Sequence, residues 1–558
     1  MNYLFLFTIG PVQPFIENSR KARDMYGGSK LLSETMELAV SWISRHNNAE
    51  VIFPQVGSAG PSDIPNRMIV RFPDIEETIL MDLADKLTVY VKHGFLDRCI
   101  EILKSAGISG DGLVLAEDQL KEYLEVYWLY EKCEDGCYIE AYKKLFSGIQ
   151  AVKGIRLLSQ TKEPWGRKCI LFPEYSAIFA KKAERKRGIS YPEHVNPKAV
   201  WDLTANATVR YAVKNNEAMS ALALVKRMYN RREIELYSIR LMLLKNKINE
   251  EVFPELKICP NDEVANALYD RANNNLEADE YSDEAVGASA VLYEYIQQNE
   301  IRLSFYYALV KFDGDDMGTH FLSKEDENGQ RELSERIGDF AKQVPRIFRE
   351  HGGLPVYAGG EDFFGYLPVN TLFDCIMAMR QAFQFKIEGT FSAGIAVAHV
   401  MQPLKEVAAL ANEMVKKAKT FQWKGSEPKN AFAIGIIKRS GETLRMPPYK
   451  MDCACGLYCM KDVKHLINLL KESGCSKSLI FNICHLFEQF ISAKEMPGRE
   501  LAEILVRELL TASHYEPSKI NENELLKDIM LFYSENYGVQ GFIDTLNGIA
   551  FLAREVGE

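Results

Sequence analysis

The pattern that most limits the fold of this chain lies between residues 304 and 438, where strand-like and helix-like segments alternate and two strands run straight into acidic residues. Short apolar runs predict strands, and apolar positions at helical spacing predict helices. The predicted order is strand, helix, strand, strand, helix, strand, followed by one more helix and strand: 304–312, 332–350, 355–358, 363–367, 372–385, 391–399, 404–421 and 431–438. This order is typical of a ferredoxin-like βαββαβ unit, an α+β fold.

Acidic side chains follow the first strand and precede the third strand of this unit. The first strand runs into Asp313 of the sequence DGDDMG, and a hairpin turn carries Glu361 and Asp362 in the sequence GGED. The first and third strands of a βαββαβ sheet are adjacent and antiparallel, so we expect these three carboxylates to lie close together. Gly359 and Gly360 suit the hairpin tip, because glycine adopts positive φ and lets other atoms approach the backbone.

Carboxylates that converge in this way raise one another's pKa values unless a cation lies between them. Oxygen ligands suit Mg²⁺ or Mn²⁺, and two such ions would activate an attacking hydroxyl group and stabilise departing pyrophosphate in phosphoryl transfer. Taken singly, DGDDMG could be an acidic helix cap or a calcium-type surface loop, and GGED could be a plain turn. Their positions at neighbouring strand ends favour a catalytic metal site over these structural interpretations.

The N-terminal part of the chain repeats the same order of strands and helices. The predicted segments are a strand at 3–9, a helical stretch at 14–44 with a turn at 26–29, strands at 51–53 and 68–72, and a helix at 75–106. The chain is therefore predicted to contain two similar α+β units.

The other segments are mainly helical. Amphipathic helices are predicted at 120–145, 218–247, 262–273 and 285–298. A loop-rich stretch at 159–197 carries the basic run KKAERKR at 181–187, which fits a solvated surface or a contact with nucleic acid. We therefore predict four domains: a first α+β domain at 1–125, a helical insert at 126–300, a catalytic α+β domain at 301–442 and a C-terminal helical bundle at 443–558.

Charge and cysteine content limit the partners and the environment. The chain of 558 residues has 67 Lys and Arg against 77 Asp and Glu, a net charge of −10, which disfavours unaided wrapping of duplex DNA. Its 11 cysteines are irregularly spaced and no secretory signal pattern precedes them, so we expect a reducing cytoplasm. The apolar N-terminal run stops at Gly10 and Pro11, and no other stretch is long enough to span a membrane, so no membrane contact is expected.

Several motifs, taken in order, resemble those of one protein family. GGEDF is similar to the GGDEF motif of diguanylate cyclases, and the acidic motifs together resemble the palm of nucleotide cyclases and polymerases. The opening IGPVQPFIENSRKARDMYGGSKLLSE resembles the N-terminal signature of the large palm subunit of Cmr-type (III-B) CRISPR effector complexes. DGDDMG, GGED, FSAGIAVAH with the following MQPLKEVAALANEMVKKAKTF, and IIKRSG continue this resemblance in the same order.

The resemblance implies two palm domains that face each other with ATP bound between them. On the second palm it implies Asp313, Glu361 and Asp362 as the catalytic metal ligands. It implies nucleotide contacts at Gly314, Asp315, Gly359, Gly360, Ser392 and Lys419 of the second palm and at Gly28, Ser29 and Lys30 of the first. The competing interpretations are a solvated helix lysine for Lys419 and a purely structural turn for the glycine-rich segment of the first palm.

The chain departs from the family pattern in three respects. Glu361 stands where the family often has Asp, which keeps the carboxylate and adds one methylene group. Many members begin with a nuclease domain with adjacent His and Asp ligands, whereas this sequence starts at the first palm and has no His-Asp dipeptide, so no nuclease activity is expected. The family's paired CxxC zinc site is reduced to Cys169, with Phe172 in place of the second cysteine. Cys133 and Cys137 could join Cys169, but three thiols fall short of a four-ligand zinc site. Zinc is therefore not expected, and buried thiols in a helical bundle are the preferred interpretation of the C-terminal cysteines at 453, 455, 459, 475 and 484.

The resemblance also implies a function: a subunit of a crRNA-guided antiviral complex that target RNA switches on. Attack of a metal-activated 3′-hydroxyl group on the α-phosphate of a second ATP would release pyrophosphate and form a 3′,5′ linkage, which leads to a cyclic oligoadenylate. An alternative product joins AMP to S-adenosylmethionine, and further alternatives are a diguanylate-cyclase-like enzyme and a non-catalytic scaffold subunit. The expected partners are the other subunits of the complex, the crRNA and the target RNA.

Overall fold

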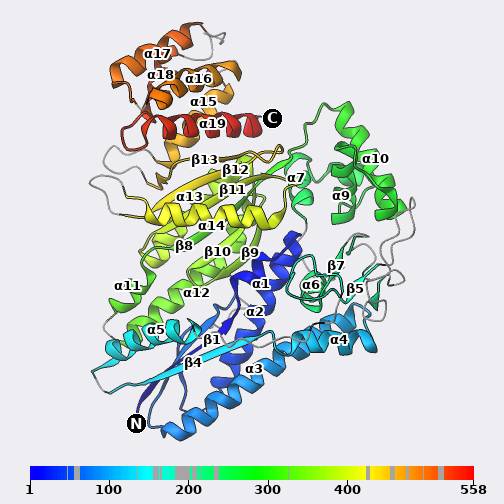
Figure 1. Cartoon of the computed structure of the whole chain (residues 1–558), viewed down its shortest axis with the longest axis vertical. Coiled ribbons are helices and arrows are strands. Elements are labelled where there is room, and N and C mark those ends of the chain that lie inside the picture. The colour runs from blue at the N-terminus through cyan, green and yellow to red at the C-terminus, as the bar shows by residue number, and fades with distance from the viewer. Residues whose placement is uncertain are drawn as a thin grey trace.

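Two sheets, each covered by helices, form the centre of the computed structural model (Figure 1). A helical insert and a C-terminal helical bundle complete the chain, so the fold is of the predicted α+β class. The structure describes residues 1–557 except 47, 56–62, 135, 155–162, 164–165, 182–200, 204–205, 207–208, 210–211, 215–216, 231–237, 325, 423–427, 453–458, 473–476, 494 and 513–520. None of the helices within the described residues has both the length and the apolar character that crossing a membrane requires.

The first palm is built on a four-stranded sheet with β1 inside it. In the order β2-β3-β1-β4, its strands are Glu50–Phe53, Arg67–Phe72, Tyr3–Gly10 and Glu125–Lys132. Alternate residues of a strand face opposite sides of a sheet, and in β1 the residues Phe5 and Phe7 pack in one core while Leu4 and Leu6 pack in another. Both faces of the sheet are covered, which explains why this strand is apolar at nearly every position.

The helical stretch that follows β1 differs from the prediction. The sequence predicts a turn at 26–29, but α2 (Ala22–Ile43) continues through these residues. The chain bends earlier, at 18–21, after the short helix α1 (Gln13–Glu17). The expected turn is therefore wrong, because the two glycines that suggested it have a different role.

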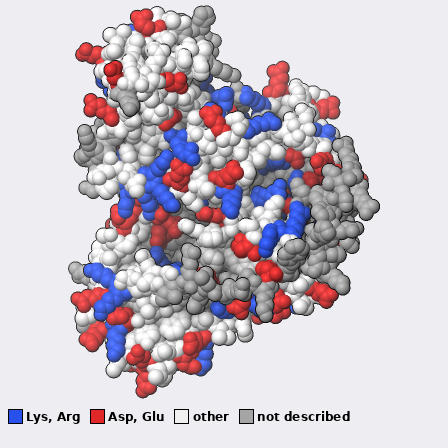
Figure 2. All heavy atoms as spheres, in the orientation of Figure 1, with Lys and Arg blue, Asp and Glu red and all other residues white. Residues whose placement is uncertain are grey.

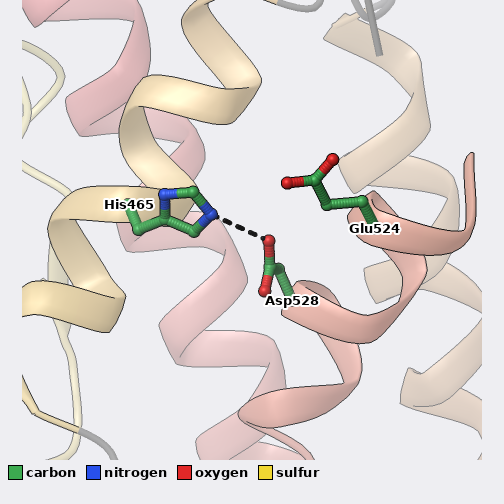
Figure 3. Close-up of side chains that lie close together, drawn as sticks. All are labelled: His465, Glu524 and Asp528. Carbon is green, nitrogen blue, oxygen red and sulfur yellow. Dashed lines mark ion pairs between the residues drawn. The ribbon is translucent and has the colours of Figure 1, made fainter. Parts of the chain in front are cut away.

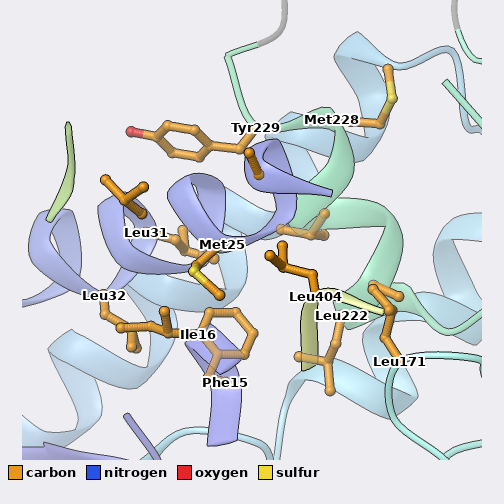
Figure 4. Close-up of a cluster of buried hydrophobic side chains, with 14 of the residues drawn as sticks. Phe15, Ile16, Met25, Leu31, Leu32, Leu171, Leu222, Met228, Tyr229 and Leu404 are labelled. Atoms are coloured by element: carbon orange, nitrogen blue, oxygen red, sulfur yellow. The ribbon is translucent and has the colours of Figure 1, made fainter. Parts of the chain in front are cut away.

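Gly27 and Gly28 allow close packing between α2 and α6 (Ala221–Met228) of the insert. A Cβ atom on Gly27 would lie 2.3 Å from the backbone oxygen of Lys226, and one on Gly28 would lie 2.9 Å from Cε of the same lysine. Figure 4 shows the apolar side chains of α1, α2 and the insert that meet around this contact. Glycine here serves helix packing and not a change of chain direction.

A second difference concerns the segment 120–145, for which the sequence predicts one helix. The segment contains the edge strand β4, with α4 (Asp111–Leu120) before it and α5 (Tyr138–Gly154) after it. Its residues, EVYWLYEK, are rich in the aromatic and β-branched side chains that suit strands. The helix prediction is wrong because β4 pairs with β1, which is far away in the sequence. The first sheet therefore extends past residue 125 to Lys132, while α3 (Glu77–Ser105) lies where predicted.

The insert contains short helices and a small three-stranded sheet. Besides α6, its elements are β5 (Phe179–Ala180), β6 (Trp201–Asp202), β7 (Ala218–Met219), α7 (Ile239–Lys247), α8 (Val252–Glu255), α9 (Asp262–Ala272), η1 (Ala278–Glu280) and α10 (Asp283–Gln298). The single helix predicted at 218–247 is represented by α6 and α7, with 231–237 outside the described residues. Residues 182–187 of the basic run also lie outside them.

The second palm has the strand order of the first. Its strands are β8 (Tyr306–Gly314), β9 (Leu354–Gly359), β10 (Asp362–Pro368), β11 (Phe391–His399), β12 (Ala431–Ile437), β13 (Thr443–Arg445) and β14 (Tyr449–Lys450). Its helices are α11 (Met317–Leu322), α12 (Glu327–Glu350), η2 (Val369–Thr371), α13 (Leu372–Ile387) and α14 (Leu404–Thr420). The series β11-β8-β10-β9 corresponds to β4-β1-β3-β2 of the first palm, so the βαββαβ unit occurs twice, as predicted.

The C-terminal bundle sits on the far edge of the second palm, in orange and red in Figure 1. Its helices are α15 (Met460–Glu472), α16 (Lys477–Ala493), α17 (Arg499–Ala512), α18 (Glu522–Leu531) and α19 (Gly538–Gly557). Residues of the bundle and of the second palm share one hydrophobic core. The helical C-terminus predicted from the sequence is therefore confirmed.

Candidate active site

The adjoining ends of β8 and β10 bring predicted catalytic carboxylates together. Asp313 of β8 is the register partner of Asp362 of β10, and residues directly opposite in antiparallel strands have Cα atoms about 4.5–5.5 Å apart. Glu361 precedes Asp362 at the hairpin tip, and its backbone oxygen accepts a hydrogen bond of 3.2 Å from the amide of Gly314. The strand order therefore predicted correctly that the three acidic residues lie together where the ends of β8 and β10 adjoin.

Two cationic side chains approach these carboxylates from different parts of the chain. Lys419 of α14 places its Nζ 2.5 Å from Oδ1 of Asp313 and 3.3 Å from the backbone oxygen of Gly314. Arg67 of the first palm places Nη2 2.7 Å from Oε1 of Glu361. Within the described residues, no basic group forms an ion pair with Asp362. The site thus holds three carboxylates and only two close counter-charges.

The environment raises the pKa of the two facing aspartates. Burial of the carboxyl group is the main cause for Asp313, where Glu361 adds to the increase and Lys419 opposes it. The side chain of Asp362 reaches the surface, yet the protein around its carboxyl group removes much of its hydration, and the charges of Glu361 and Asp313 raise its pKa further. Carboxylates in this state are favourable ligands for a cation, because a cation removes the repulsion between them.

The predicted nucleotide contacts Asp315 and Ser392 lie deeper in the second palm and bind each other. The buried carboxylate of Asp315 accepts hydrogen bonds of 2.8 Å from both Thr390 Oγ1 and Ser392 Oγ, and one of 3.0 Å from the amide of Asn430. Ser392 is also the strand partner of Asp313. These contacts fix the loop that follows Asp313 to the neighbouring strand.

The glycines of the hairpin tip have separate structural reasons. A Cβ atom on Gly359 would lie 2.3 Å from Oη of Tyr357. Gly360 has φ of 68°, a conformation that favours glycine, and its Cα faces Pro65 and Phe53 of the first palm. The tip of the second-palm hairpin therefore lies directly against the first palm.

The first-palm residues implied for nucleotide binding form one stretch of α2. Gly28 faces Lys226, and Ser29 is buried with its Oγ lacking a hydrogen-bond partner among the described residues. Lys30 forms an ion pair with Asp63, whose other carboxylate oxygen accepts a hydrogen bond of 2.9 Å from the amide of Ala358. Burial alone would lower the pKa of Lys30, but the Asp63 carboxylate raises it. This chain of contacts links α2 to β9, directly before the GGED turn.

Arg67 and Asp63 are site residues that the sequence reasoning missed. Both lie between β2 and the start of β3, the part of the first palm that corresponds to the β9–β10 hairpin of the second. These equivalent parts of the two palms lie against each other. Assuming that the two repeated units pack face to face could have predicted this contact. No local motif marks either residue, because their partners lie in the other palm.

Asp313, Glu361 and Asp362 are the residues that could hold a divalent metal ion. All three offer hard carboxylate oxygens, the donor type that Mg²⁺ and Mn²⁺ prefer. Asp362 has no counter-charge of its own in the described part of the chain, so an added cation would complete the charge balance. The chemistry of the donors therefore fits the predicted ion, although among the described residues the three carboxylates do not bring one oxygen each within 4.8 Å of the others.

A different group of potential metal ligands lies in the C-terminal bundle. His465 of α15 faces Glu524 and Asp528 of α18, and its Nε2 lies 3.1 Å from Oδ2 of Asp528 (Figure 3). Both His465 and Glu524 are exposed, and the ion pair already accounts for the contact. Among the described residues, no cysteine belongs to such a group of three potential ligands. Cys459 is disulfide-bonded, so the expectation of a thiol at that position is wrong.

Comparison with known proteins shows similarity to Cas10/Cmr2 domains in two parts of the chain. The model of Cas10/Cmr2, second palm domain, matches residues 306–433, which include all three carboxylates of the site. The model of CRISPR-associated protein Cmr2, N-terminal, matches residues 4–92, which include α2 and Arg67. Both matches are to domains of Cas10/Cmr2 proteins, and they occur in the expected order along the chain. The expected resemblance to the large palm subunit of Cmr-type complexes is thereby confirmed.

Relatives of known sequence or structure agree with this assignment. The CRISPR system Cmr subunit Cmr2 of Pyrococcus furiosus is 23% identical over 565 residues, which cover 78% of this chain and 62% of that relative. The chain thus spans less than two thirds of the relative's length. Two structures of a type III-B Cmr-beta complex, in the apo state and bound to cognate target RNA, have TM-scores of 0.66 and 0.65. They are 15% and 14% identical, cover 99% of this chain and 82% and 83% of those chains, and show the same fold.

Proposed function

We propose that the chain is the nucleotidyltransferase subunit of a crRNA-guided type III-B complex and that target RNA switches it on. It would use ATP and Mg²⁺ or Mn²⁺ to form a 3′,5′-linked cyclic oligoadenylate as a second messenger. The observation that carries the proposal is the register of Asp313 opposite Asp362, with Glu361 at the same hairpin tip. The match of residues 306–433 to the second palm domain of Cas10/Cmr2 supports it, together with the resemblance of the acidic motifs to those of nucleotide cyclases.

The three carboxylates would hold the divalent ion, which would activate a 3′-hydroxyl group and neutralise charge on the transferred phosphate. Asp313 and Asp362 would supply oxygen ligands from opposing strands, and Glu361 from the turn between them. Nζ of Lys419 lies 2.5 Å from Oδ1 of Asp313. When the ion binds Asp313 in place of this ammonium group, Lys419 would turn toward the triphosphate. The hydrogen-bonded group of Asp315, Thr390 and Ser392 would keep the loop after Asp313 in position.

The first palm would contact the nucleotide from the opposite side. Ser29 supports this role, because its buried hydroxyl group has no partner among the described residues and a phosphate or ribose oxygen would supply one. Lys30 would bring positive charge close to the same position, since Asp63 and Ala358 connect it to the acidic hairpin. Gly28 would remain a packing residue beneath them.

We propose the crRNA, the target RNA and the other subunits of a type III-B complex as partners in the cytoplasm. On the face shown in Figure 2, Lys and Arg side chains are interspersed with Asp and Glu and form no continuous basic surface. Together with the net charge of −10, this favours a division of labour in which partner subunits hold most of the RNA.

The test is to incubate the assembled complex with target RNA, labelled ATP and Mg²⁺, with and without S-adenosylmethionine, and to identify the products by mass. We expect cyclic oligoadenylate and pyrophosphate from the wild type and neither from an Asp313→Asn variant. Asp316→Asn is the matched control, because Asp316 lies in the same loop but pairs with Lys429 at the surface. Products that require S-adenosylmethionine would select the AMP conjugate, and unchanged pyrophosphate release by Asp313→Asn would exclude this site.

A further inference from the structure

The contact between Arg67 and Glu361 joins the first palm to the acidic site of the second. Arg67 is the first residue of β3, and its guanidinium group lies 2.7 Å from Glu361. The same group lies over the rings of Phe53 at 5.7 Å and Phe146 at 5.4 Å from their centroids. Two aromatic rings and a carboxylate therefore define its position, and such cation–π contacts are favourable for arginine.

Glu361 is also one of the three carboxylates proposed to bind the divalent ion. A carboxylate oxygen that accepts a charged hydrogen bond from arginine is unavailable to an ion at the same lone pair. The positive charge of Arg67 also opposes a second cation nearby, because unit charges a few ångströms apart interact strongly when partly shielded from water. Arg67 and the ion thus compete for the same side chain.

We propose that Arg67 is a positioning residue that holds Glu361 against the first palm and competes with the divalent ion for its carboxylate. The inference rests on the proposed metal site of the second palm. Binding of the ion at Glu361 would release the Arg67 contact, so metal binding and the contact between the two palms are coupled. Glu361 then differs from Asp313 and Asp362, which lie on the facing strands and, among the described residues, form no ion pair with the first palm.

The chain offers a matched control on the same strand. Arg71 lies four residues after Arg67, on the same face of β3, and forms an ion pair with Glu327 at the start of α12 in the second palm. Both arginines form an ion pair with a carboxylate of the second palm, but of the two only Arg67 contacts the acidic site. A role limited to docking the palms predicts similar behaviour when either arginine is replaced.

The test measures Mn²⁺ binding to the full chain without ATP, from the electron paramagnetic resonance signal of free Mn²⁺. We expect Arg67→Met to bind Mn²⁺ several-fold more tightly than the wild type, and Arg67→Lys and Arg71→Met to bind it as the wild type does. In a Glu361→Gln background, Arg67→Met should change Mn²⁺ binding much less, because the competed carboxylate is gone and only the charge of Arg67 near Asp362 is removed. Thermal unfolding of each variant shows that the compared proteins are folded.

Several results would overturn the proposal: unchanged or weaker Mn²⁺ binding by Arg67→Met, an equal change in Arg71→Met, or an effect of Arg67→Met that is as large in the Glu361→Gln background as in the wild type. Absence of Mn²⁺ binding by the wild type would overturn it as well. Because the measurement needs no turnover, its outcome is separate from that of the proposed function. A complex that binds Mn²⁺ as expected but makes no nucleotide product would exclude the proposed reaction and leave the role of Arg67 intact.

Discussion

Replacing Arg227 with methionine tests the ion network that fixes α2, with its predicted nucleotide contacts, against the insert. Nη2 of Arg227 lies 2.9 Å from Oδ2 of Asp24, and its Nη1 lies 3.1 Å from Oε2 of Glu217. None of the three side chains is more than 1% exposed. Methionine fills similar space but leaves two buried carboxylates without their main partner. Breaking a buried pair in this way costs about 3–5 kcal/mol of unfolding free energy, which urea unfolding at pH 7 should report.

Acid should reduce this difference between the wild type and the variant. Burial alone would raise the pKa of Glu217, but Arg227 outweighs it and lowers the pKa from 4.5 to about 2. The resulting stabilisation is complete above the unfolded pKa of 4.5 and is lost as the pH falls toward 2. Without Arg227, the main cause that lowers the pKa of Glu217 is gone, so the folded variant loses less stability than the wild type as the pH falls. Both effects make the two proteins more alike in acid.

The control is Lys86→Met on α3, which removes an exposed ion pair with Asp82. Such surface pairs contribute little, and we expect a loss below about 0.5 kcal/mol. A loss under about 1 kcal/mol for Arg227→Met, or a difference from the wild type that widens in acid, would refute the reasoning.

Two further substitutions test packing and loop geometry. Gly27→Ala places a methyl group 2.3 Å from the Lys226 backbone oxygen and should lower the free energy of unfolding by about 1–3 kcal/mol. Gly287→Ala is the control: no atom lies within 4 Å of its new Cβ, so the melting temperature should stay unchanged or rise. Asp315→Asn directs an amide group at hydrogen-bond donors, so it should lower the free energy of unfolding in urea by about 1–3 kcal/mol and reduce product formation. Asp316→Asn, at the surface, should lower the same free energy by less than about 1 kcal/mol. Equal effects within either pair of variants would contradict the contacts described.

The sequence pattern around each strand end was enough to predict that Asp313 and the GGED turn lie side by side. The apolar run of β8 ends in Asp313, and the GGED turn connects β9 to β10, so the residues themselves mark both strand ends. The general order of a βαββαβ sheet then places the two ends side by side. The pairing of Asp313 with Asp362 follows from these two facts without any knowledge of distant contacts.

Contacts between distant segments account for what the sequence could not predict. The segment of β4 has a mixed pattern, and only its pairing with β1 makes it a strand. The glycines of α2 suggest a turn until Lys226 of the insert is known to pack on them. Arg67 likewise begins an ordinary strand, and its importance comes entirely from Glu361 in the other palm.

The most direct test of the central claim is the position of Mn²⁺ in crystals of the chain grown with a non-hydrolysable ATP analogue, located by anomalous scattering. The account predicts a peak about 2 Å from carboxylate oxygens of Asp313 and Asp362. The peak should be absent in an Asp313→Asn, Asp362→Asn double variant that still folds. An anomalous map with no peak between the ends of β8 and β10, or a peak there that survives the double substitution, would contradict it.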